Sequence, residues 1–446
     1  MSLLFGVFYI FLLILRSICS IIKRNAPQRC DSAFSATRRI SVMKNFELYN
    51  PVRVIFGNGE SEDIGRYVEG LGKKALVVSY GSATLNALRG RVEASLKRRG
   101  IEVVPFYCIT ANPLLSHIRE AVEICRTQGV DLCIAVGGGS VMDATKAIAA
   151  GVLYEHDLWQ MFISRQDRDV CIPPERSLPT VMIPTLPATS SEMNCIAVAT
   201  NDETKEKAYI YTAALYPTLA IMDPSLTCTL PAFHTVVGAA DAMSHVLEAY
   251  LNGDQHSPLQ DRLHEGILVT IMSELREILK DPTNVEHRAN MQWAASLAWN
   301  GYLQSGLDAP TPMHQMGHVL SALYNTPHGV TLAIFMDAFF RYTSTLNEER
   351  AKRFALLGTN IFGLDSRMPA MEAAAKTVDM LVSFMDEIGV PHTLSAAGVP
   401  LSDIEKIADE IVAHGCNAQG ELPSIPPIGR EGILKILNMA KGNEAK

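Results

Sequence analysis

Histidine and aspartate recur at helical spacing within one stretch of this chain. Asp241 and His245 are four residues apart, and His314 and His318 form a second such pair, with His328 following after a short interruption. Side chains four residues apart on a helix project from the same face, so each pair can direct two groups at one point. One carboxylate and several imidazoles are a suitable ligand set for a divalent ion such as Fe²⁺ or Zn²⁺. The spacing therefore predicts a site for one divalent metal ion.

Each of these residues also has a simpler interpretation. A single histidine is more often a surface group or a satisfied core residue than a ligand, and an Asp/His pair at this spacing is often only a local ion pair. The chain has only 12 histidines, however, so the concentration of these five residues within 241–328 favours a metal site.

A second candidate site is a glycine-rich turn. The apolar run 131–136 has the composition of a buried strand, residues 137–140 read Gly-Gly-Gly-Ser, and a helical stretch follows over 141–150. Glycine lets the backbone approach a pyrophosphate closely, and the first N–H groups of the helix can donate to it. A turn of this kind can also be only a connection. It matches neither GxGxxG nor GxxxxGK[ST], which speaks against the commonest dinucleotide fingerprint and against a P-loop nucleotidase.

Composition limits the classes of partner. The chain has 446 residues, of which 48% are hydrophobic, so it can bury a large core and would most naturally form two domains. Its net charge is −8 with both signs mixed along the sequence, so no basic stripe is available for a nucleic acid. The 9 cysteines are odd in number and form no CxxC pair, which indicates a reduced compartment without a disulfide framework or a zinc ribbon.

The elements that must hold these groups follow from the periodicity of the sequence. Before about residue 232, short β-branched runs alternate with stretches of helical length, such as 83–99 and 114–127, which favours βαβ units and a parallel sheet. Afterwards the chain reads as successive helices interrupted by proline. We therefore expect a Rossmann-like nucleotide-binding α/β domain over 43–232 and an all-α, metal-binding domain over 233–446. The predicted strands are 52–56, 75–79, 102–106, 131–136, 180–184 and 218–223.

The first 42 residues, 1–42, differ from the rest. Residues 3–15 are almost entirely apolar, and arginines and lysines follow them. This run is short for a membrane span, which needs about 20 residues, and a signal peptide would carry its basic residues before the apolar core. An organelle transit peptide, a membrane anchor, an extension with no role in the chemistry and a true start at Met43 are the alternatives.

The motifs, taken in their order along the chain, resemble those of one family. They are Val54-Ile-Phe-Gly-Asn-Gly59, Asn112-Pro113, Gly137-Gly-Gly-Ser-Val-Met-Asp-Ala-Thr-Lys146, Thr185-Leu-Pro-Ala-Thr-Ser-Ser-Glu192, Asp223-Pro224, Asp241-x3-His245 and His314-x3-His318-x9-His328. From about Met43 to its end, the chain resembles the iron-containing (group III) alcohol dehydrogenases, and within them the NADPH-using butanol dehydrogenase and aldehyde reductase branch. The resemblance implies a dehydroquinate-synthase-like fold, a homodimer, and hydride transfer between NAD(P)H and short- to medium-chain aldehydes or alcohols.

The family's functional residues map onto this chain one by one. The resemblance places the metal ligands at Asp241, His245, His314 and His328, with His318 beside the metal. The cofactors it implies are NADPH, with NADH possible, and one divalent ion, Fe²⁺ or Zn²⁺. The implied nucleotide contacts are Asn112, Gly137, Gly138, Gly139, Ser140, Asp143, Thr185, Thr189 and Lys207.

Two positions depart from the family's pattern. Where relatives commonly read Thr-Gly-Ser-Glu, this chain has Ser190 after Thr189, which adds a side chain next to the nicotinamide pocket. After the predicted strand 75–79, NAD-preferring relatives carry an Asp that holds the ribose hydroxyls and repels a 2′-phosphate. This chain has Gly81 and Ser82 there and no acid, so we favour NADPH and include both residues among the cofactor contacts. The alternative is a merely polar strand-to-helix loop.

The expected mechanism gives each group one role. A metal in the cleft between the domains would act as a Lewis acid on the substrate oxygen, while hydride passes between the nicotinamide and the carbonyl carbon. His318, with an ordinary histidine pKa of about 6.5, is the expected catalytic residue and would relay the proton between that oxygen and solvent. Candidate pocket walls, chosen because they lie near the ligands in sequence, are Trp293, Trp299, Tyr302, Met313 and Tyr324.

Rival interpretations account for part of these observations. A glycerol-dehydrogenase-like enzyme would use three metal ligands, and a dehydroquinate-synthase-like enzyme would need basic residues for a phosphorylated substrate. A non-catalytic, membrane-tethered nucleotide-binding protein would not need all of the residues found.

We expect a small-molecule partner, no nucleic acid, and membrane contact only if the N-terminal segment is retained. We expect a cytoplasmic catalytic part, with a mitochondrion-type organelle or an N-terminal membrane anchor as the alternative.

Overall fold

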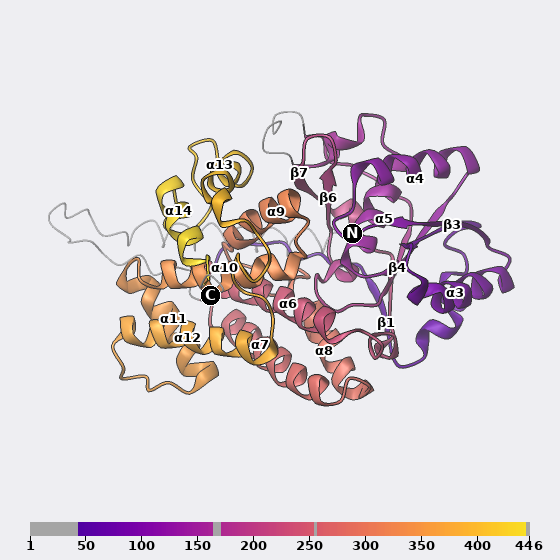
Figure 1. The fold of residues 1–446 in the computed structure, drawn as a ribbon. Coiled ribbons are helices and arrows are strands. Elements are labelled where there is room, and N and C mark those ends of the chain that lie inside the picture. The colour runs from indigo at the N-terminus through magenta and orange to yellow at the C-terminus, as the bar shows by residue number, and fades with distance from the viewer. Residues whose placement is uncertain (1–42, 164–170, 254–256, 443–446) are drawn as a thin grey trace, which may run out of the picture. The chain divides into compact units, whose positions relative to one another are not determined.

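The computed structural model describes residues 43–163, 171–253 and 257–442. The expectations for residues 1–42 lie outside these ranges. Figure 1 shows an α/β part, which contains the strands, followed along the chain by a part built of helices. No helix in the described ranges combines the length and the apolar character that crossing a membrane requires.

The α/β part is built around a parallel sheet of six strands. The strand order is β1-β8-β5-β4-β2-β3, and each neighbouring pair is parallel. All six predicted strands are present, with ends that differ from the predicted ones by a few residues. They are β1 Arg53–Phe56, β2 Lys74–Tyr80, β3 Glu102–Ile109, β4 Leu132–Gly137, β5 Thr180–Pro184 and β8 Leu219–Met222.

Helices cover both faces of this sheet. Alternate side chains of β4 point to opposite faces, so Ala135 packs in one apolar cluster with the inner sides of α4 and α5, while Ile134 packs in another with α3. Every residue of β4 is buried, as expected for a parallel sheet covered on both sides. The helices of this part are α2 Gly65–Val68, α3 Asn86–Arg98, α4 Leu115–Gln128 and α5 Gly139–Val152.

An antiparallel hairpin, which the sequence analysis did not predict, stands apart from the main sheet. Strands β6 (Ile196–Asn201) and β7 (Glu206–Tyr211) pair with each other, with Ala199 opposite Ala208. In Figure 1 the hairpin lies between α5 and α9, where it joins the α/β part to the helical part. Strand β7 carries Lys207, one of the predicted cofactor contacts.

The rest of the chain is helical, as predicted. Proline occupies the first position of α7 and of α9, where its missing N–H costs no hydrogen bond. The helices are α6 Ala232–Asn252, α7 Pro258–Lys280, α8 Val285–Ala298, α9 Pro312–Tyr324, α10 His328–Ser344, α11 Glu348–Phe362, α12 Ala370–Ile388, α13 Ile404–Gly415 and α14 Arg430–Met439. Short 3₁₀ turns lie at Glu60–Asp63, Ala83–Leu85, Leu158–Met161, Ser191–Met193, Ala213–Leu215, Pro224–Thr227 and Leu401–Asp403.

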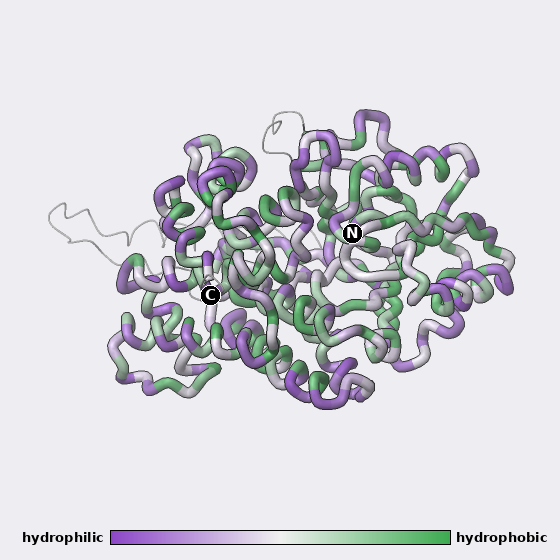
Figure 2. Tube along the Cα trace, in the orientation of Figure 1, coloured by the Kyte–Doolittle hydropathy of each residue, from purple (hydrophilic) through white to green (hydrophobic). Residues whose placement is uncertain are grey.

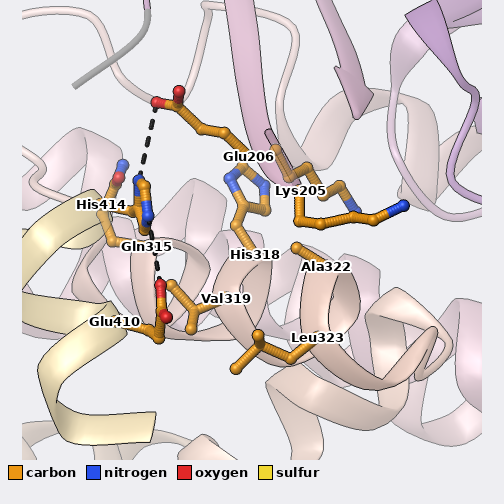
Figure 3. A pocket seen from close by; sticks show the side chains of 10 residues that line it. Lys205, Glu206, Gln315, His318, Val319, Ala322, Leu323, Glu410 and His414 are labelled. Carbon is orange, nitrogen blue, oxygen red and sulfur yellow. Dashed lines mark ion pairs between the residues drawn. The ribbon is translucent and has the colours of Figure 1, made fainter. Parts of the chain in front are cut away.

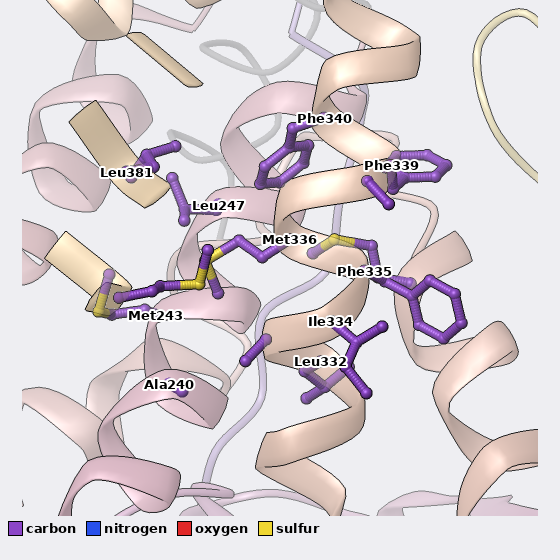
Figure 4. Close-up of a cluster of buried hydrophobic side chains, with 14 of the residues drawn as sticks. Ala240, Met243, Leu247, Leu332, Ile334, Phe335, Met336, Phe339, Phe340 and Leu381 are labelled. Atoms are coloured by element: carbon purple, nitrogen blue, oxygen red, sulfur yellow. The ribbon is translucent and has the colours of Figure 1, made fainter. Parts of the chain in front are cut away.

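Two buried helices, α6 and α10, form the centre of the helical part. Figure 4 shows Met243 and Leu247 of α6 close to Met336 and Phe340 of α10, and all four side chains are fully buried. The outer helices alternate between hydrophilic and hydrophobic residues along their length, as Figure 2 shows for α13 and α11. Since α6 and α10 also carry three of the predicted metal ligands, those ligands lie on helices that are buried over most of their length.

Candidate active site

One carboxylate and three imidazoles meet where α6, α9 and α10 come together. Asp241 and His245 lie one turn apart on α6, His314 lies on α9, and His328 is the first residue of α10. Nε2 of His245 is 4.0 Å from Oδ1 of Asp241, and Nε2 of His328 is 3.9 Å from the same oxygen. Potential ligand atoms of Asp241, His245 and His314 all lie within 4.8 Å of one another. Two bonds of about 2.1 Å to one ion span at most about 4.2 Å, so the two pairs suit a shared ion.

The cluster provides no protein partners for two of these ligand atoms. Among the described residues, Oδ1 of Asp241 and Nε2 of His314 are buried and have no hydrogen-bond partner. Burial raises the pKa of Asp241 to about 7 and lowers the pKa of His314 to about 3, because a charge is less stable away from water. A bound cation would satisfy both atoms and would stabilise the ionised carboxylate. The residues therefore fit a divalent ion.

Glu248, which the sequence analysis missed, orients one member of this cluster. It lies on α6 two turns after Asp241 and is fully buried. Its Oε1 accepts from the backbone N–H of Met313 over 2.6 Å, and its Oε2 accepts from Nδ1 of His314. With Nδ1 occupied as a donor, Nε2 of His314 keeps its lone pair for the ion. The spacing of Glu248 from Asp241 and His245, on the same helical face, is the signal that could have identified it.

His318 lies at the edge of this cluster, facing a pocket. It is one turn beyond His314 on α9, and its ring centre is 5.3 Å from that of His328. Figure 3 shows its imidazole near Glu206 and Lys205 in a pocket that α13 also lines. Burial, and then nearby positive charge, lowers the pKa of His318 well below the ordinary value expected from the sequence. The imidazole is therefore neutral, and it can pass a proton by accepting at one nitrogen and donating from the other.

Lys207 and Asn112 connect the α/β part to the helix that carries two of the histidines. Nζ of Lys207 donates to Oδ1 of Asn112 over 2.9 Å, and Nδ2 of Asn112 donates to Asn325, at the end of α9, over 3.0 Å. Burial lowers the pKa of Lys207 to about 8, and the carboxylates of Asp143 and Asp241 oppose that shift. Lys207 thus lies near one acid from each part of the molecule, so the structure brings predicted cofactor and metal residues together.

The glycine turn forms the opposite side of the site. Residues 137–140 lead from β4 into α5, and the glycine at the helix N-cap has no side chain to occupy the first N–H groups. A Cβ on Gly139 would lie 2.5 Å from Cγ2 of Thr189, and the backbone N–H of Thr185 donates to the carbonyl of Gly137 over 3.0 Å. Close backbone packing therefore requires glycine here and gathers the predicted contacts around a helix N-terminus, which is a ready anion site.

The carboxylate of Asp143 bonds to the segment 191–198. Its Oδ1 accepts from Oγ of Ser191 over 2.6 Å, and its Oδ2 accepts from the backbone N–H of Val198 over 3.1 Å. Burial raises the pKa of Asp143, while the neighbouring Lys146 opposes the shift. The contact of Asp143 with a cofactor stays a prediction, since in this structure its oxygens bind protein groups.

The nucleotide side and the metal side touch directly. A Cβ on Gly238, one turn before Asp241 on α6, would lie 2.5 Å from the carbonyl oxygen of Pro187, which lies between Thr185 and Thr189. The absence of a side chain at Gly238 therefore lets the loop of predicted nucleotide contacts pack against the helix of predicted metal ligands. This contact makes the two sites one candidate active site.

The loop expected to distinguish NADPH from NADH lies at the same edge of the sheet. Gly81 and Ser82 follow β2, which neighbours β4 in the sheet, so both strands end beside the turn 137–140. Oγ of Ser82 accepts from the backbone N–H of Thr84, and the guanidinium of Arg89 donates to the carbonyl of Ser82. The loop carries hydroxyl and guanidinium groups and no carboxylate.

The candidate pocket walls differ in how close they lie to the cluster. The indole of Trp299 stacks on the imidazole of His245, with ring centres 5.4 Å apart. Met313 is buried beside His314, whereas Trp293 and Tyr302 are 41% and 46% exposed. Trp299 is therefore the aromatic candidate that contacts a predicted metal ligand.

Comparison with known proteins agrees with this arrangement. The family described as iron-containing alcohol dehydrogenase matches residues 51–224, and the C-terminal domain of the Fe-containing alcohol dehydrogenase family matches residues 235–441. NADH-dependent butanol dehydrogenase A of Clostridium acetobutylicum is 35% identical over 396 residues, which cover 88% of this chain and 99% of that protein. The NADPH-dependent aldehyde reductase YqhD of Escherichia coli is 32% identical, covering 85% of this chain and 96% of that protein.

Solved structures show the same fold. The crystal structure of NADH-dependent butanol dehydrogenase A from Thermotoga maritima superposes with a TM-score of 0.83 at 37% identity, over 90% of this chain and 100% of that one. The chain belongs to the iron-containing alcohol dehydrogenase family. The family resemblance and the fold class expected from the sequence are thereby confirmed, and membership implies NAD(P)H and a divalent metal ion as cofactors.

Proposed function

We propose that this protein is a metal-dependent alcohol dehydrogenase or aldehyde reductase that uses NAD(P)H. The observation that carries the proposal is the buried cluster of Asp241, His245, His314 and His328, in which the carboxylate oxygen Oδ1 of Asp241 has no hydrogen-bond partner among the described residues. The packing of Gly238 against the loop of Pro187 sets this cluster beside the glycine turn. A metal site next to a pyrophosphate site is the arrangement that metal-assisted hydride transfer requires.

The four ligand residues would hold the ion, and the turn 137–140 would hold the pyrophosphate. When bound, the ion supplies a Lewis acid for the substrate oxygen and the nicotinamide supplies or accepts the hydride. Glu248 keeps the imidazole of His314 in the orientation that presents Nε2 to the ion. The apolar packing of α6 and α10 behind the cluster excludes water from that side.

His318 is the residue we propose for proton transfer to and from the substrate oxygen. It adjoins His328 and faces the pocket, so one side of its ring lies near the cluster and the other lies toward Lys205 and Glu206. Replacing His318 should slow turnover while the ion is retained. Replacing His328 should remove the ion and the activity together.

We propose NADPH as the preferred cofactor. The loop at Gly81 and Ser82 offers space and a hydroxyl group to a 2′-phosphate, and Arg89 adds a positive charge behind it. Relatives at similar identity are named for NADH as well as for NADPH, so the preference rests on this loop. A Ser82→Asp variant should shift the preference toward NADH, because a carboxylate binds ribose hydroxyls and repels a 2′-phosphate.

The proposal extends to the ion, the substrates, the assembly, the domains and the location of the protein. We propose Fe²⁺ or Zn²⁺ as the ion, short- to medium-chain aldehydes or alcohols as substrates, and a homodimer as the assembly. The division into a nucleotide-binding domain over 43–232 and a metal-binding domain over 233–446 follows the change from strands to helices at α6. A cytoplasmic location of the catalytic part is proposed with it.

The experiment uses the purified full-length chain. The protein is stripped with a chelator and reloaded with Fe²⁺ or Zn²⁺, and oxidation of NADPH or NADH is followed with butyraldehyde as substrate. Metal-dependent oxidation that is faster with NADPH than with NADH would support the reaction, the metal site and the cofactor preference. A loaded protein that binds both metal and nucleotide but reduces no aldehyde would contradict the proposal.

A further inference from the structure

Ser190 has a backbone conformation that serine rarely adopts. Its φ is 54° and its ψ is 15°, in the left-handed region, and the residue is buried. Glycine is the residue that this conformation favours, so a serine here is under strain that some interaction must offset. The side chain of Ser190 provides that interaction.

The hydroxyl of Ser190 enters the last turn of α8. It donates to the carbonyl oxygen of Ala295 over 2.6 Å and accepts from the backbone N–H of Trp299 over 2.9 Å. Residues 295 and 299 are four apart, so in a continuous helix this N–H would donate directly to this carbonyl. The hydroxyl takes the place of that bond, α8 ends at Ala298, and Trp299 takes a non-helical φ of −144° and ψ of 52°.

The carbonyl of the same tryptophan is held from the same loop. Nδ2 of Asn194 donates to the carbonyl oxygen of Trp299 over 3.2 Å, and the carboxamide of Asn194 also binds the buried ammonium of Lys146. Both backbone groups of Trp299 are therefore bonded to residues 190–194 of the α/β part, although Trp299 belongs to the helical part.

The indole that these bonds position lies on the metal cluster. It stacks on His245 at 5.4 Å and 26°, and His245 stacks on His314 at 4.7 Å and 18°. The indole is also nearly parallel to the ring of His314, at 6.4 Å and 21°. The three rings are nearly parallel and lie next to one another, so the position of the indole restricts the tilt of two proposed metal ligands.

We infer that Ser190 is a positioning residue, which ends α8 so that Trp299 packs against the imidazoles of His245 and His314. The loop beside the glycine turn thereby sets the geometry of the metal cluster, and the assignment of the cluster as a metal site rests on the proposed function. Ser190→Gly removes only the hydroxyl, because glycine tolerates the backbone conformation. Without the hydroxyl, α8 can close the direct bond from Trp299 to Ala295 and carry the indole away from the imidazoles.

Tryptophan emission tests this inference without relying on turnover. The full chain has 3 tryptophans, so Trp159→Phe and Trp293→Phe leave Trp299 as the only emitter. In this double variant, which serves as the parent protein, the metal-free emission spectrum depends on the packing of Trp299 against His245. Added Co²⁺ should quench the emission. Ser190→Gly should shift the metal-free spectrum to the red and weaken Co²⁺ binding roughly 10-fold, in the range of changes that misplace metal ligands. An unchanged spectrum and an unchanged Co²⁺ affinity would overturn the inference.

Three further variants make the result specific. Ser190→Ala also lacks the hydroxyl and should change the spectrum in the same way, while Ser305→Gly removes a comparable hydroxyl-to-carbonyl bond, at 2.8 Å, without contacting Trp299 and should change neither readout. If Ser190 acts through the indole, adding Ser190→Gly to Trp299→Leu should not weaken Co²⁺ binding beyond Trp299→Leu alone, and additive losses would overturn the inference. A parent that binds no Co²⁺ would contradict the proposed function, while the metal-free spectra would still decide the role of Ser190.

Discussion

Two buried ligand atoms of the metal cluster have no hydrogen-bond partner among the described residues, whereas two predicted cofactor contacts are already bonded within the protein. Oδ1 of Asp241 and Nε2 of His314 have no hydrogen-bond partner among the described residues. By contrast, both oxygens of Asp143 and the ammonium of Lys207 have protein partners. The metal cluster needs an ion to satisfy its buried polar atoms. The nucleotide site has its hydrogen bonds in place before the cofactor binds.

This difference predicts different responses to ligand removal. Since a metal would satisfy buried groups on α6, α9 and α10, it should stabilise the helical part strongly, because any ligand that binds only the folded state adds to its stability. The nucleotide turn is shaped by backbone packing around Gly137 and Gly139, so the loss of cofactor should change that fold little.

The largest expected effect is that of His314→Ala. Removing Nε2 takes away a proposed ligand, so metal binding should be lost, the melting temperature should no longer rise on addition of Zn²⁺, and turnover should fall on the order of 10³-fold or more. Metal content by atomic emission and thermal unfolding measure both effects. His264→Ala is the control, because His264 is another fully buried histidine and contacts Gln260 of its own helix. It should lower stability while the metal is retained.

A smaller effect is expected from Glu248→Gln. The carboxylate accepts two hydrogen bonds, from Met313 and His314, but an amide offers one acceptor and turns an NH₂ group toward the other donor. Zn²⁺ affinity, measured by competition with a chromogenic chelator, should fall by about 10- to 100-fold. The matched change Glu265→Gln alters a buried glutamate that bonds Tyr250 instead, and it should leave the affinity unchanged. Equal Zn²⁺ affinities in the two variants would contradict the role of Glu248 in orienting His314.

The ligand residues could be found from the sequence because helical spacing is local. Asp241 and His245, and likewise His314 and His318, need only one turn of helix to share a face. The six strands of the main sheet were equally predictable, because each is a short run of mostly apolar residues. Spacing also places Glu248 on the same helical face. The roles of Glu248 and Ser190 were not accessible, because each acts through a residue far along the chain, 66 positions away for Glu248 and 105 for Ser190.

Three features that the sequence analysis did not anticipate have the same origin. The extra side chain at Ser190 was expected beside the nicotinamide pocket, and the bonding of its hydroxyl to the end of α8 was not anticipated. His318 was expected to keep an ordinary pKa, but burial lowers it. The hairpin at 196–211 escaped prediction because its turn lacks the Asn-Gly or Asp-Gly pair that marks tight hairpins. Each outcome depends on tertiary packing, which periodicity does not encode.

Gly139→Ala tests whether cofactor binding can be weakened without changing metal binding. Its Cβ would lie 2.5 Å and 2.7 Å from the side chain of Thr189, closer than packing allows, so the turn must shift. We expect the dissociation constant for NADPH, measured by fluorescence titration, to rise about 10-fold, since overpacking costs about 1–3 kcal/mol. Zn²⁺ affinity should stay the same. Gly90→Ala, on the exposed side of α3 with nothing within 4 Å of its Cβ, should change neither value.

The smallest effect is expected at His414, which joins the two parts across the pocket. Nδ1 of His414, on α13, is 3.9 Å from Glu206 of β7, and Nε2 is 3.2 Å from Glu410 (Figure 3). Pairing with the carboxylate of Glu206 raises the pKa of His414 in the folded state. The protonated form is thus favoured by folding, so its contribution to stability is complete below the unfolded pKa of about 6.5 and is lost as the pH rises through the folded value.

His414→Ala should therefore reduce the free energy of unfolding mainly on the acidic side, by about 1 kcal/mol at most for a partly exposed pair. Urea titrations of both proteins across this pH range give the difference directly. His156→Ala, which removes an exposed histidine, is the control. A loss at His414 that grew toward alkaline pH would have the wrong sign for a protonated histidine and would show that Glu206 holds the two parts together by another contact.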